Sequence, residues 1–143
     1  MAAIKTYLVP VDFSKTAEKA LAHAVQLARD NKAKLLLFHG IEEANAMVPF
    51  HLRDHYFRSL EKEAKEHIAK LISRHRLPLK GYRVVVRRGR NVARLISQQA
   101  KQSRVAMIIM GSHGYTGLSR VLLGSVAEET LRYVSCPVLI VKK

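Results

Sequence analysis

The chain has 143 residues, of which 48% are hydrophobic, and it carries 25 Lys and Arg against 11 Asp and Glu, a net charge of +14. This length suits one folded domain with its own apolar core, so we expect a single domain over residues 1–143. No apolar run reaches the roughly 20 residues that cross a bilayer, residues 1–5 lack the pattern of a secretory signal, and the single cysteine, Cys136, excludes an internal disulfide; these features favour a cytoplasmic protein.

The chain begins with an apolar run and a helical pattern. Residues 4–11 predict a strand, and Asp12 follows at its carboxyl end. Ser14 is typical of a helix N-cap. In residues 15–30 small apolar side chains recur on one face, which predicts a helix.

A second strand is expected at residues 33–39, and an amphipathic helix at residues 54–76. The connection at residues 40–53 is long for a compact domain, and such loops are often functional. His67 and His75 lie in the second helix without other residues of the metal-binding type, so we expect ordinary surface histidines.

A third strand is predicted at residues 81–87, with a turn at residues 88–90. Asn91 is a natural N-cap for a short helix over residues 92–100. Residues 105–110 are apolar and uncharged, which is typical of a central strand buried on both faces.

The stretch that follows the fourth strand is the most informative. Gly111 and Gly114 come directly after it, and Gly124 and Ser125 precede the helical pattern of residues 126–134. We expect Gly111 to let the chain turn off the strand and Gly114 to let the backbone approach a ligand. Ser125 is expected to cap the helix. Backbone N–H groups here, with a helix N-terminus behind them, favour an anion.

Residues 137–141 predict a fifth strand. The order is therefore strand and helix in strict alternation, beginning and ending with a strand. Apolar strands joined by helical crossovers predict an α/β fold, an open five-stranded parallel sheet with helices on both faces.

The glycine spacing resembles a known family. Gly-x-x-Gly, nine residues, then Gly-Ser is similar to the nucleotide-binding signature of the universal stress protein family, in its ATP-binding branch. The flanking residues 9–14, 109–114 and 136–141 are similar too, so the resemblance covers nearly the whole chain. The stretch differs from a Walker A loop because no Gly-Lys-Ser/Thr follows, and it differs from the dinucleotide fingerprint.

The resemblance implies strand order 3-2-1-4-5, an adenine-nucleotide alpha-hydrolase-like arrangement. With that order the first and fourth strands are neighbours, and the chain winds away from them in both directions. Ligands of open α/β sheets bind outside the carboxyl ends of the strands at such a junction. Asp12 and Gly111 end these two strands and are therefore expected to meet there.

The implied ligand is ATP accompanied by Mg²⁺, with ADP or AMP left open. Asp12 suits the ribose hydroxyls as an acceptor, although aspartates also cap turns after strands. The residue matching Ile41 contacts the adenine through its backbone in the family. The phosphates are expected on backbone N–H groups of the glycine stretch. These donors belong to Gly111, Gly114, Gly124, Ser125 and Val126.

Three functions remain open at this point. The first is an ATP-binding regulator of a stress response. The second is a slow ATPase or phosphotransferase, against which stands the absence of a lysine in the glycine stretch; His113, the titratable side chain there, is expected at the loop surface. The third is a basic nucleic-acid-binding protein, although the strands lack interleaved aromatics.

Charge and assembly complete the expectations. No Asp or Glu occurs between Glu66 and Glu128, whereas Lys and Arg are frequent there, and such a field attracts polyanions weakly and without sequence preference. If the family order holds, residues 138–141 form an edge strand. Family members commonly pair this strand with its twin, so the resemblance implies a homodimer of twofold symmetry.

Overall fold

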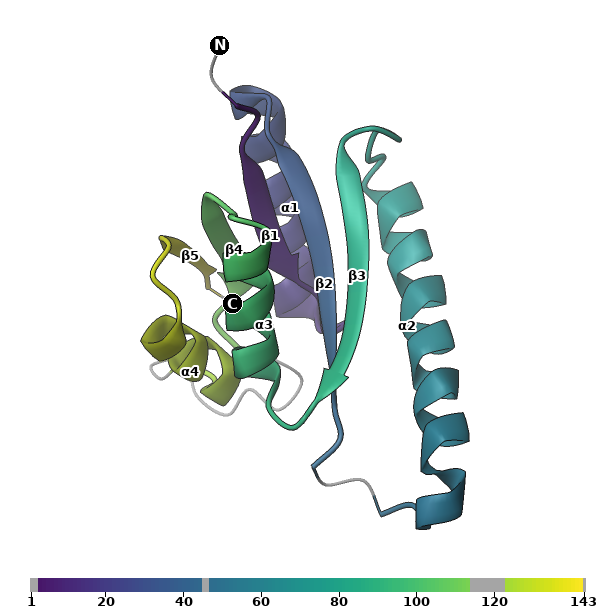
Figure 1. Ribbon diagram of the computed structural model, residues 1–143. Coiled ribbons are helices and arrows are strands. Elements are labelled where there is room, and N and C mark those ends of the chain that lie inside the picture. Colours follow the sequence, from purple (N-terminus) through teal and green to yellow (C-terminus); the bar gives the residue numbers. More distant parts are fainter. Residues whose placement is uncertain (1–2, 45–46, 114–122, 143) are drawn as a thin grey trace.

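The computed structural model describes residues 3–44, 47–113 and 123–142. Within them the strands form one parallel sheet in the order β3-β2-β1-β4-β5 (Figure 1). The strands are β1 (Thr6–Pro10), β2 (Lys34–Glu42), β3 (Tyr82–Gly89), β4 (Met107–Gly111) and β5 (Val138–Val141). The predicted α/β architecture and the strand order 3-2-1-4-5 are both confirmed.

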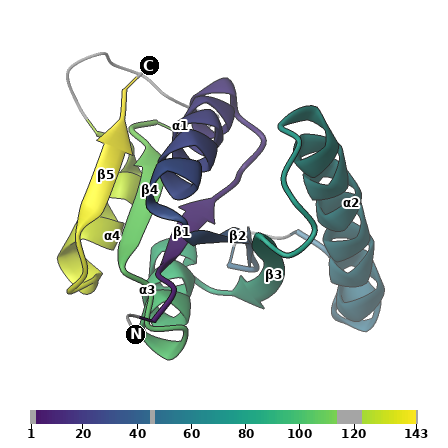
Figure 2. The ribbon, with the colours of Figure 1, turned by 90° about the horizontal axis from the view of Figure 1, so that it is seen from above.

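Helices cover the two faces of this sheet, as Figure 2 shows in a view from above. Those described are α1 (Lys15–Asn31), α2 (Arg53–Arg74), α3 (Val92–Gln102) and α4 (Ser125–Tyr133), with a 3₁₀ turn, η1 (Phe50–Leu52), before α2. Helices α1 and α2 share an apolar core with one face of the sheet, and α3 and α4 share another with the opposite face.

Strand β2 shows why the central runs are apolar throughout. Leu35 and Leu37 enter the core under α1 and α2, whereas Leu36 and Phe38 enter the core under α3 and α4. All four are at most 3% exposed. A strand buried on both faces cannot alternate apolar and polar residues, and for this reason it appears in the sequence as a continuous apolar run.

Two strands are longer than predicted. β2 continues to Glu42 and β3 to Gly89, so the predicted turn at residues 88–90 is wrong. The extra residues pair with one another, Ile41 with Arg88 and Glu42 with Gly89. Gly89 lies close to α3, and a Cβ added at this position would approach Leu95 Cδ2 to 2.8 Å. The absence of a side chain lets α3 pack against this end of β3.

Two predicted helix caps are confirmed. The Ser14 hydroxyl accepts a hydrogen bond from the Ala17 N–H at 3.1 Å, and the Asn91 side chain accepts one from the Arg94 N–H at 2.9 Å. Each bond satisfies an N–H that the first turn of a helix leaves unpaired.

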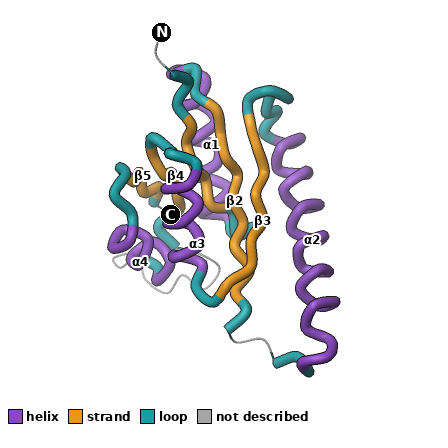
Figure 3. The backbone as a smooth tube through the Cα atoms, in the orientation of Figure 1, coloured by secondary structure: helices purple, strands orange, loops and turns teal. Residues whose placement is uncertain are grey.

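The carboxyl ends of the strands and the first turns of α3 and α4 gather at one end of the molecule (Figure 3). At the other end lie the first residues of β2 and the connection from α2 to β3. The two ends of the sheet are therefore built from different parts of the chain.

Glu18 links α1 to the end of α2. Its carboxylate accepts hydrogen bonds from Arg74 and, at 3.1 Å, from His75. The His75 side chain is only 18% exposed, so the expectation of an ordinary surface histidine is wrong. The bond from Arg74, helped by His75, lowers the pKa of Glu18 against the opposing effect of burial.

Replacing Glu18 with Gln should lower the free energy of unfolding at pH 7 by about 0.5–1 kcal/mol, the range for a partly exposed ion pair. Because the folded pKa lies below the unfolded one, this contribution is present above the unfolded pKa and is lost as pH falls through the folded value. Urea unfolding at pH 7 and at about pH 2.5, well below the usual pKa of glutamate, measures it. Glu63→Gln, on the exposed face of α2, is the control. A difference from wild type that is the same at both pH values would contradict the assignment.

Candidate functional site

The candidate site lies where β1 and β4 end side by side. From this point the chain leaves β1 into α1 on one face and leaves β4 toward α4 on the other. In open α/β sheets, ligands bind in a crevice outside the carboxyl ends of two strands that diverge in this way. We call this place the β1–β4 crevice.

Asp12 lies in the tight connection that follows β1. Its Oδ1 accepts hydrogen bonds from the Ser14 N–H at 3.0 Å and from the Ser14 hydroxyl. The side chain remains exposed. The turn role that aspartates commonly play is therefore present, and it holds an exposed carboxylate at the crevice. A ribose contact remains a prediction.

Phe13 has an unusual backbone conformation that the sequence did not indicate. Its φ is +66°, which bulky residues rarely adopt and which costs on the order of 1–3 kcal/mol. Its ring packs between His39, at a centroid distance of 4.8 Å, and His67, at 4.7 Å. This packing offsets the strain and fixes the residue next to Asp12. His67 is exposed as predicted, but it has this contact as well.

His39 ties the ends of β1 and β2 together. Its Nδ1 lies 2.6 Å from the Val11 carbonyl oxygen, so Nδ1 carries the proton and donates it. Burial lowers the pKa of His39, against the opposing effects of this hydrogen bond and of the nearby Asp12. A neutral imidazole therefore sits beside the crevice at neutral pH.

The backbone of β2 faces the crevice at Gly40 rather than at Ile41. The Leu35 N–H donates toward β3, whereas the Phe38 carbonyl accepts from the residue after β1. Successive residues of a strand point their backbone groups to opposite sides. Gly40 therefore points its N–H and carbonyl to the β1 side, as Phe38 does. Ile41 points its groups to the β3 side, as Leu35 does. Since β1 ends opposite Phe38, the Gly40 groups face the crevice without a strand partner. The expected ligand contact from the Ile41 backbone stays a prediction, and Gly40 is the neighbouring residue whose backbone groups face the crevice.

Gly111 is a glycine for a different reason from the predicted one. It lies within β4, paired with Val141, and no described glycine has a positive φ. A Cβ at this position would lie 2.8 Å from Thr16 Cγ2 and 3.0 Å from the Thr16 carbonyl carbon. The absent side chain lets the first turn of α1 pack against β4, which brings the connection containing Asp12 next to the end of β4.

The start of α4 also differs from the prediction. Gly124 is the N-cap and Ser125 is the first helical residue, so the expected Ser125 cap is wrong. The Gly124 N–H donates to the Ser112 carbonyl at 2.7 Å, which removes it from the predicted phosphate donors. The first intrahelical bond is donated by Glu128. The N–H groups of Ser125 and Val126 precede it, have no partner within the helix, and carry the positive end of its dipole.

The remaining glycine, Gly114, lies outside the described residues. His113, next to it, is only 6% exposed, so the expected surface histidine is wrong. Its Nδ1 lies 2.9 Å from the Ser112 hydroxyl, and its buried Nε2 has no partner among the described residues. Ser112 is held by Val141 and Gly124, and these bonds draw the segment onto the end of the sheet.

The basic run of the sequence lies partly on β3 and α3. Arg83 donates to the Ser103 hydroxyl at 2.9 Å, and the Arg94 guanidinium lies 4.6 Å from the centre of the Tyr133 ring. Both partners are uncharged. By contrast, Arg88 on the other face of β3 pairs with carboxylates of α2. The α3 side of the sheet therefore keeps more of its positive charge.

Two features were searched for across the described residues. No group of three or more His, Cys, Asp and Glu side chains there could hold a metal ion. Nor does that part of the chain contain a helix with the length and apolar character needed to cross a membrane.

Comparison with known proteins agrees with this architecture. The model of the universal stress protein family matches residues 3–142. The chain belongs to the universal stress protein family. Among its relatives is the universal stress protein YxiE of Bacillus subtilis, 30% identical over 94% of this chain and 97% of its own length.

A second relative in the universal stress protein family is MJ0577 of Methanocaldococcus jannaschii, 31% identical over 97% of this chain and 95% of its own length. Its solved structure has a TM-score of 0.88 and covers 99% of this chain and 98% of that one. The universal stress protein of Archaeoglobus fulgidus, solved in complex with dAMP, has a TM-score of 0.70 at 19% identity and covers 99% and 100% of the two chains; this likeness shows the fold alone.

The packing of α1 against β4 can be tested by a double-mutant cycle. Gly111→Ala should lower the free energy of unfolding by about 1–3 kcal/mol, the usual cost of overpacking, because its Cβ would meet Thr16. In a Thr16→Ser background, which lacks the Cγ2 methyl, the loss should shrink by roughly 0.5 kcal/mol or more. Urea unfolding of the four proteins measures this. Strictly additive losses would contradict the proposed contact.

Proposed function

We propose that this universal stress protein is a cytoplasmic, ATP-binding regulator, whose bound nucleotide stabilises one conformation or dimer that a partner recognises. The observation that supports the proposal is the junction of β1 and β4. An exposed carboxylate, Asp12, follows β1, the backbone of Gly40 extends past the end of β1, and α4 begins with unpaired N–H groups next to Gly124, which is bonded to Ser112 after β4. Membership of the universal stress protein family also supports the proposal.

These groups suit the three parts of a nucleotide. The N–H groups of Ser125 and Val126 favour the phosphates, since a helix N-terminus attracts negative charge. In our proposal the backbone N–H of Gly114 is a further donor to the phosphates. Because negative charges repel one another, the Asp12 carboxylate suits the ribose better than the phosphates. There it accepts hydrogen bonds from the ribose hydroxyls. The N–H and carbonyl of Gly40 match the donor and acceptor edge of adenine.

The cofactor in this proposal is ATP, with ADP or AMP as alternatives. Mg²⁺ accompanies ATP and is held mainly through phosphate oxygens, which are ligands that it prefers. The proposed role is binding rather than phosphoryl transfer, because the glycine stretch from Gly111 to Ser125 contains no lysine of the kind that neutralises a transferring phosphate.

Calorimetric titration with ATP and Mg²⁺ tests the site. We expect binding of low micromolar to millimolar affinity. Asp12→Asn keeps an acceptor for the Ser14 turn but removes the charge, and it should weaken binding on the order of 10- to 100-fold, the cost of a charged hydrogen bond. Asp30→Asn, at the exposed end of α1, should bind as the wild type does. Absence of heat and of any thermal shift at millimolar ATP would refute the proposal.

The same titration followed by amide NMR separates the two adenine assignments. The Gly40 amide should shift on saturation, together with those of Ser125 and Val126. The Gly124 and Ile41 amides already donate inside the protein or face β3, so their shifts should be smaller. Large chemical-shift changes at Ile41 and Gly124, with none at Gly40, would instead support the ligand contacts that the sequence predicted.

We also propose a homodimer through β5, which the strand order places at the sheet edge. Leu139 on this strand is 40% exposed, and an apolar edge strand invites pairing. Two charges of +14 oppose association, but salt screens them over about 8–10 Å. Sedimentation should show a dimer that strengthens as salt rises and that Leu139→Lys disrupts, whereas Leu52→Lys leaves it intact. A monomer at low and high salt would contradict this.

A further inference from the structure

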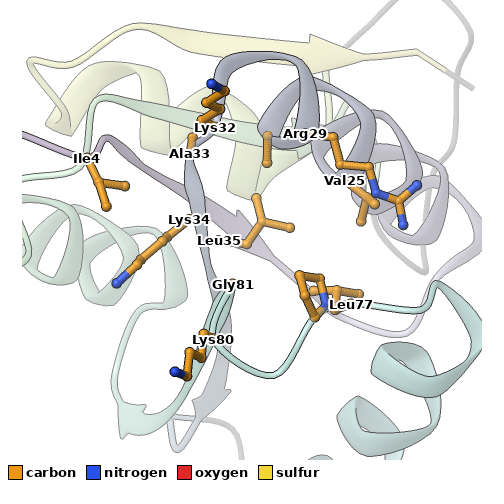
Figure 4. A pocket seen from close by; sticks show the side chains of 12 residues that line it. Ile4, Val25, Arg29, Lys32, Ala33, Lys34, Leu35, Leu77, Lys80 and Gly81 are labelled. Atoms are coloured by element: carbon orange, nitrogen blue, oxygen red, sulfur yellow. The ribbon is translucent and has the colours of Figure 1, made fainter.

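A pocket of about 290 Å³ lies at the end of the sheet opposite the β1–β4 crevice (Figure 4). It opens between the last turns of α1, the start of β2 and the connection from α2 to β3. Its size is just below the usual range for small-molecule pockets, ~300–1,000 Å³. Helix α1 and the sheet separate it from Asp12, so the two places are distinct.

The pocket has an apolar floor. Leu35 from β2 and Leu77 from the connection extend into it in Figure 4. Val25 and Ala28 of α1 complete the floor, and all four residues are at most 9% exposed. Ile4 also lines the pocket but is 63% exposed. An apolar ligand would therefore remove further apolar surface from water when it covers Ile4.

The rim of this pocket is strongly positive. Its charged lining residues are Arg29, Lys32, Lys34 and Lys80, and the lining contains no Asp or Glu. None of the four forms an ion pair within the described part of the chain. The adjacent carboxylate, Asp30, is not part of the lining and accepts a hydrogen bond from Gln26.

The rim cations lie on two sides of the floor. Figure 4 shows Lys34 and Lys80 with their ammonium groups directed to the same side, and Arg29 beyond the floor on the other side. The four side chains are exposed, so their charges stay in water while their stems border apolar surface. Lys34 and Lys80 are directed away from Leu35 and Leu77, as expected for Lys34 because neighbouring residues of a strand point to opposite faces. An anionic head would therefore be met at the edge of the floor, while an apolar tail lies on Leu35 and Leu77.

We propose that this pocket binds a small amphipathic carboxylate, an unbranched fatty acid of medium chain length. The uncompensated cations select for negative charge, and the apolar floor selects for a hydrocarbon tail. A metal cation is disfavoured by the same charges. A second copy of this chain packed symmetrically on the pocket would bring the same four cations together, which makes it a poor occupant.

Calorimetric titration of the 143-residue protein with decanoate tests the proposal. Decanoate should bind, and two matched probes should bind at least about tenfold more weakly: decanol, which lacks the charge, and butyrate, which lacks the tail. Equal affinity for decanol would overturn the role of the cations. No heat with decanoate below its micelle-forming concentration would overturn the proposal altogether.

Charge reversal locates the head group. Lys34→Glu/Lys80→Glu should weaken decanoate binding by about tenfold or more. Lys62→Glu/Lys101→Glu changes the net charge equally on exposed positions of α2 and α3 and should leave the affinity within about twofold. Both variants should keep wild-type circular dichroism. Equal weakening by the two pairs would show a nonspecific charge effect and would contradict the site.

Methyl NMR locates the tail. On decanoate saturation the methyl resonances of Leu35 and Leu77 should shift, and cross-relaxation should connect the ligand tail to Leu77. Shifts confined to residues of the β1–β4 crevice would overturn the pocket as the site. Capture of the protein by phosphatidylglycerol vesicles without binding of free decanoate would assign the surface to a membrane instead. ATP titration of Lys34→Glu/Lys80→Glu should match that of wild type, so the outcome is independent of the nucleotide proposal.

Discussion

Two-sided burial of the central strands is the constraint on which the rest of this structure depends. Leu8, Leu36 and Ile108 face one layer of helices, and Val9, Leu37 and Ile109 face the other, with no exposed surface on any of them. The chain must therefore supply helices to both faces of one sheet. Parallel strands require a crossover for every new strand, and the hand of such crossovers is almost invariant. A chain that starts in the middle can then reach both edges only by reversing its direction of winding, and the reversal leaves the crevice between β1 and β4.

The residues around that crevice show how the core supports an exposed carboxylate. Asp12 is held by Ser14, whose hydroxyl in turn caps α1. The strained backbone of Phe13 is kept in place by two histidine rings, one of which is bonded to the end of β1. Local strain of this kind persists only where the surrounding structure determines it more than once. The Asp12 side chain, which faces solvent, is thus positioned by the buried Ser14 and by the packed rings next to it.

The two ends of the sheet differ because all its strands run in the same direction, so one end collects their carboxyl ends and the other their amino ends. At the carboxyl end, α4 begins with unpaired N–H groups, and the backbone of β2 extends past the end of β1 without a strand partner, so this end offers directional hydrogen bonds. At the opposite end, Arg29 in the last turn of α1 and Lys32 at its C-cap border apolar side chains, Lys34 begins β2, and Lys80 precedes β3. That end offers charge and apolar area rather than directed donors. Positive side chains of this basic protein thus lie in at least two places, on the α3 side of the sheet and around the apolar pocket.

Local pattern by itself determined the elements, the sheet type, two helix caps and the position of the glycine stretch. Continuous apolar runs, small residues at helical spacing, and Ser14 and Asn91 before their helices act over a few neighbouring residues and can be recognised without the fold; the strand order and the nucleotide came from the family resemblance. Only the tertiary structure decided the remainder, because it depends on residues distant in the sequence. Gly111 is a glycine because Thr16 packs on it, Gly124 cannot donate outward because Ser112 takes its N–H, and Gly40 faces the crevice because of the register of β2 with its two neighbours. The burial of His113 and the pocket beneath the end of α1 likewise arise from surfaces that no single segment contains.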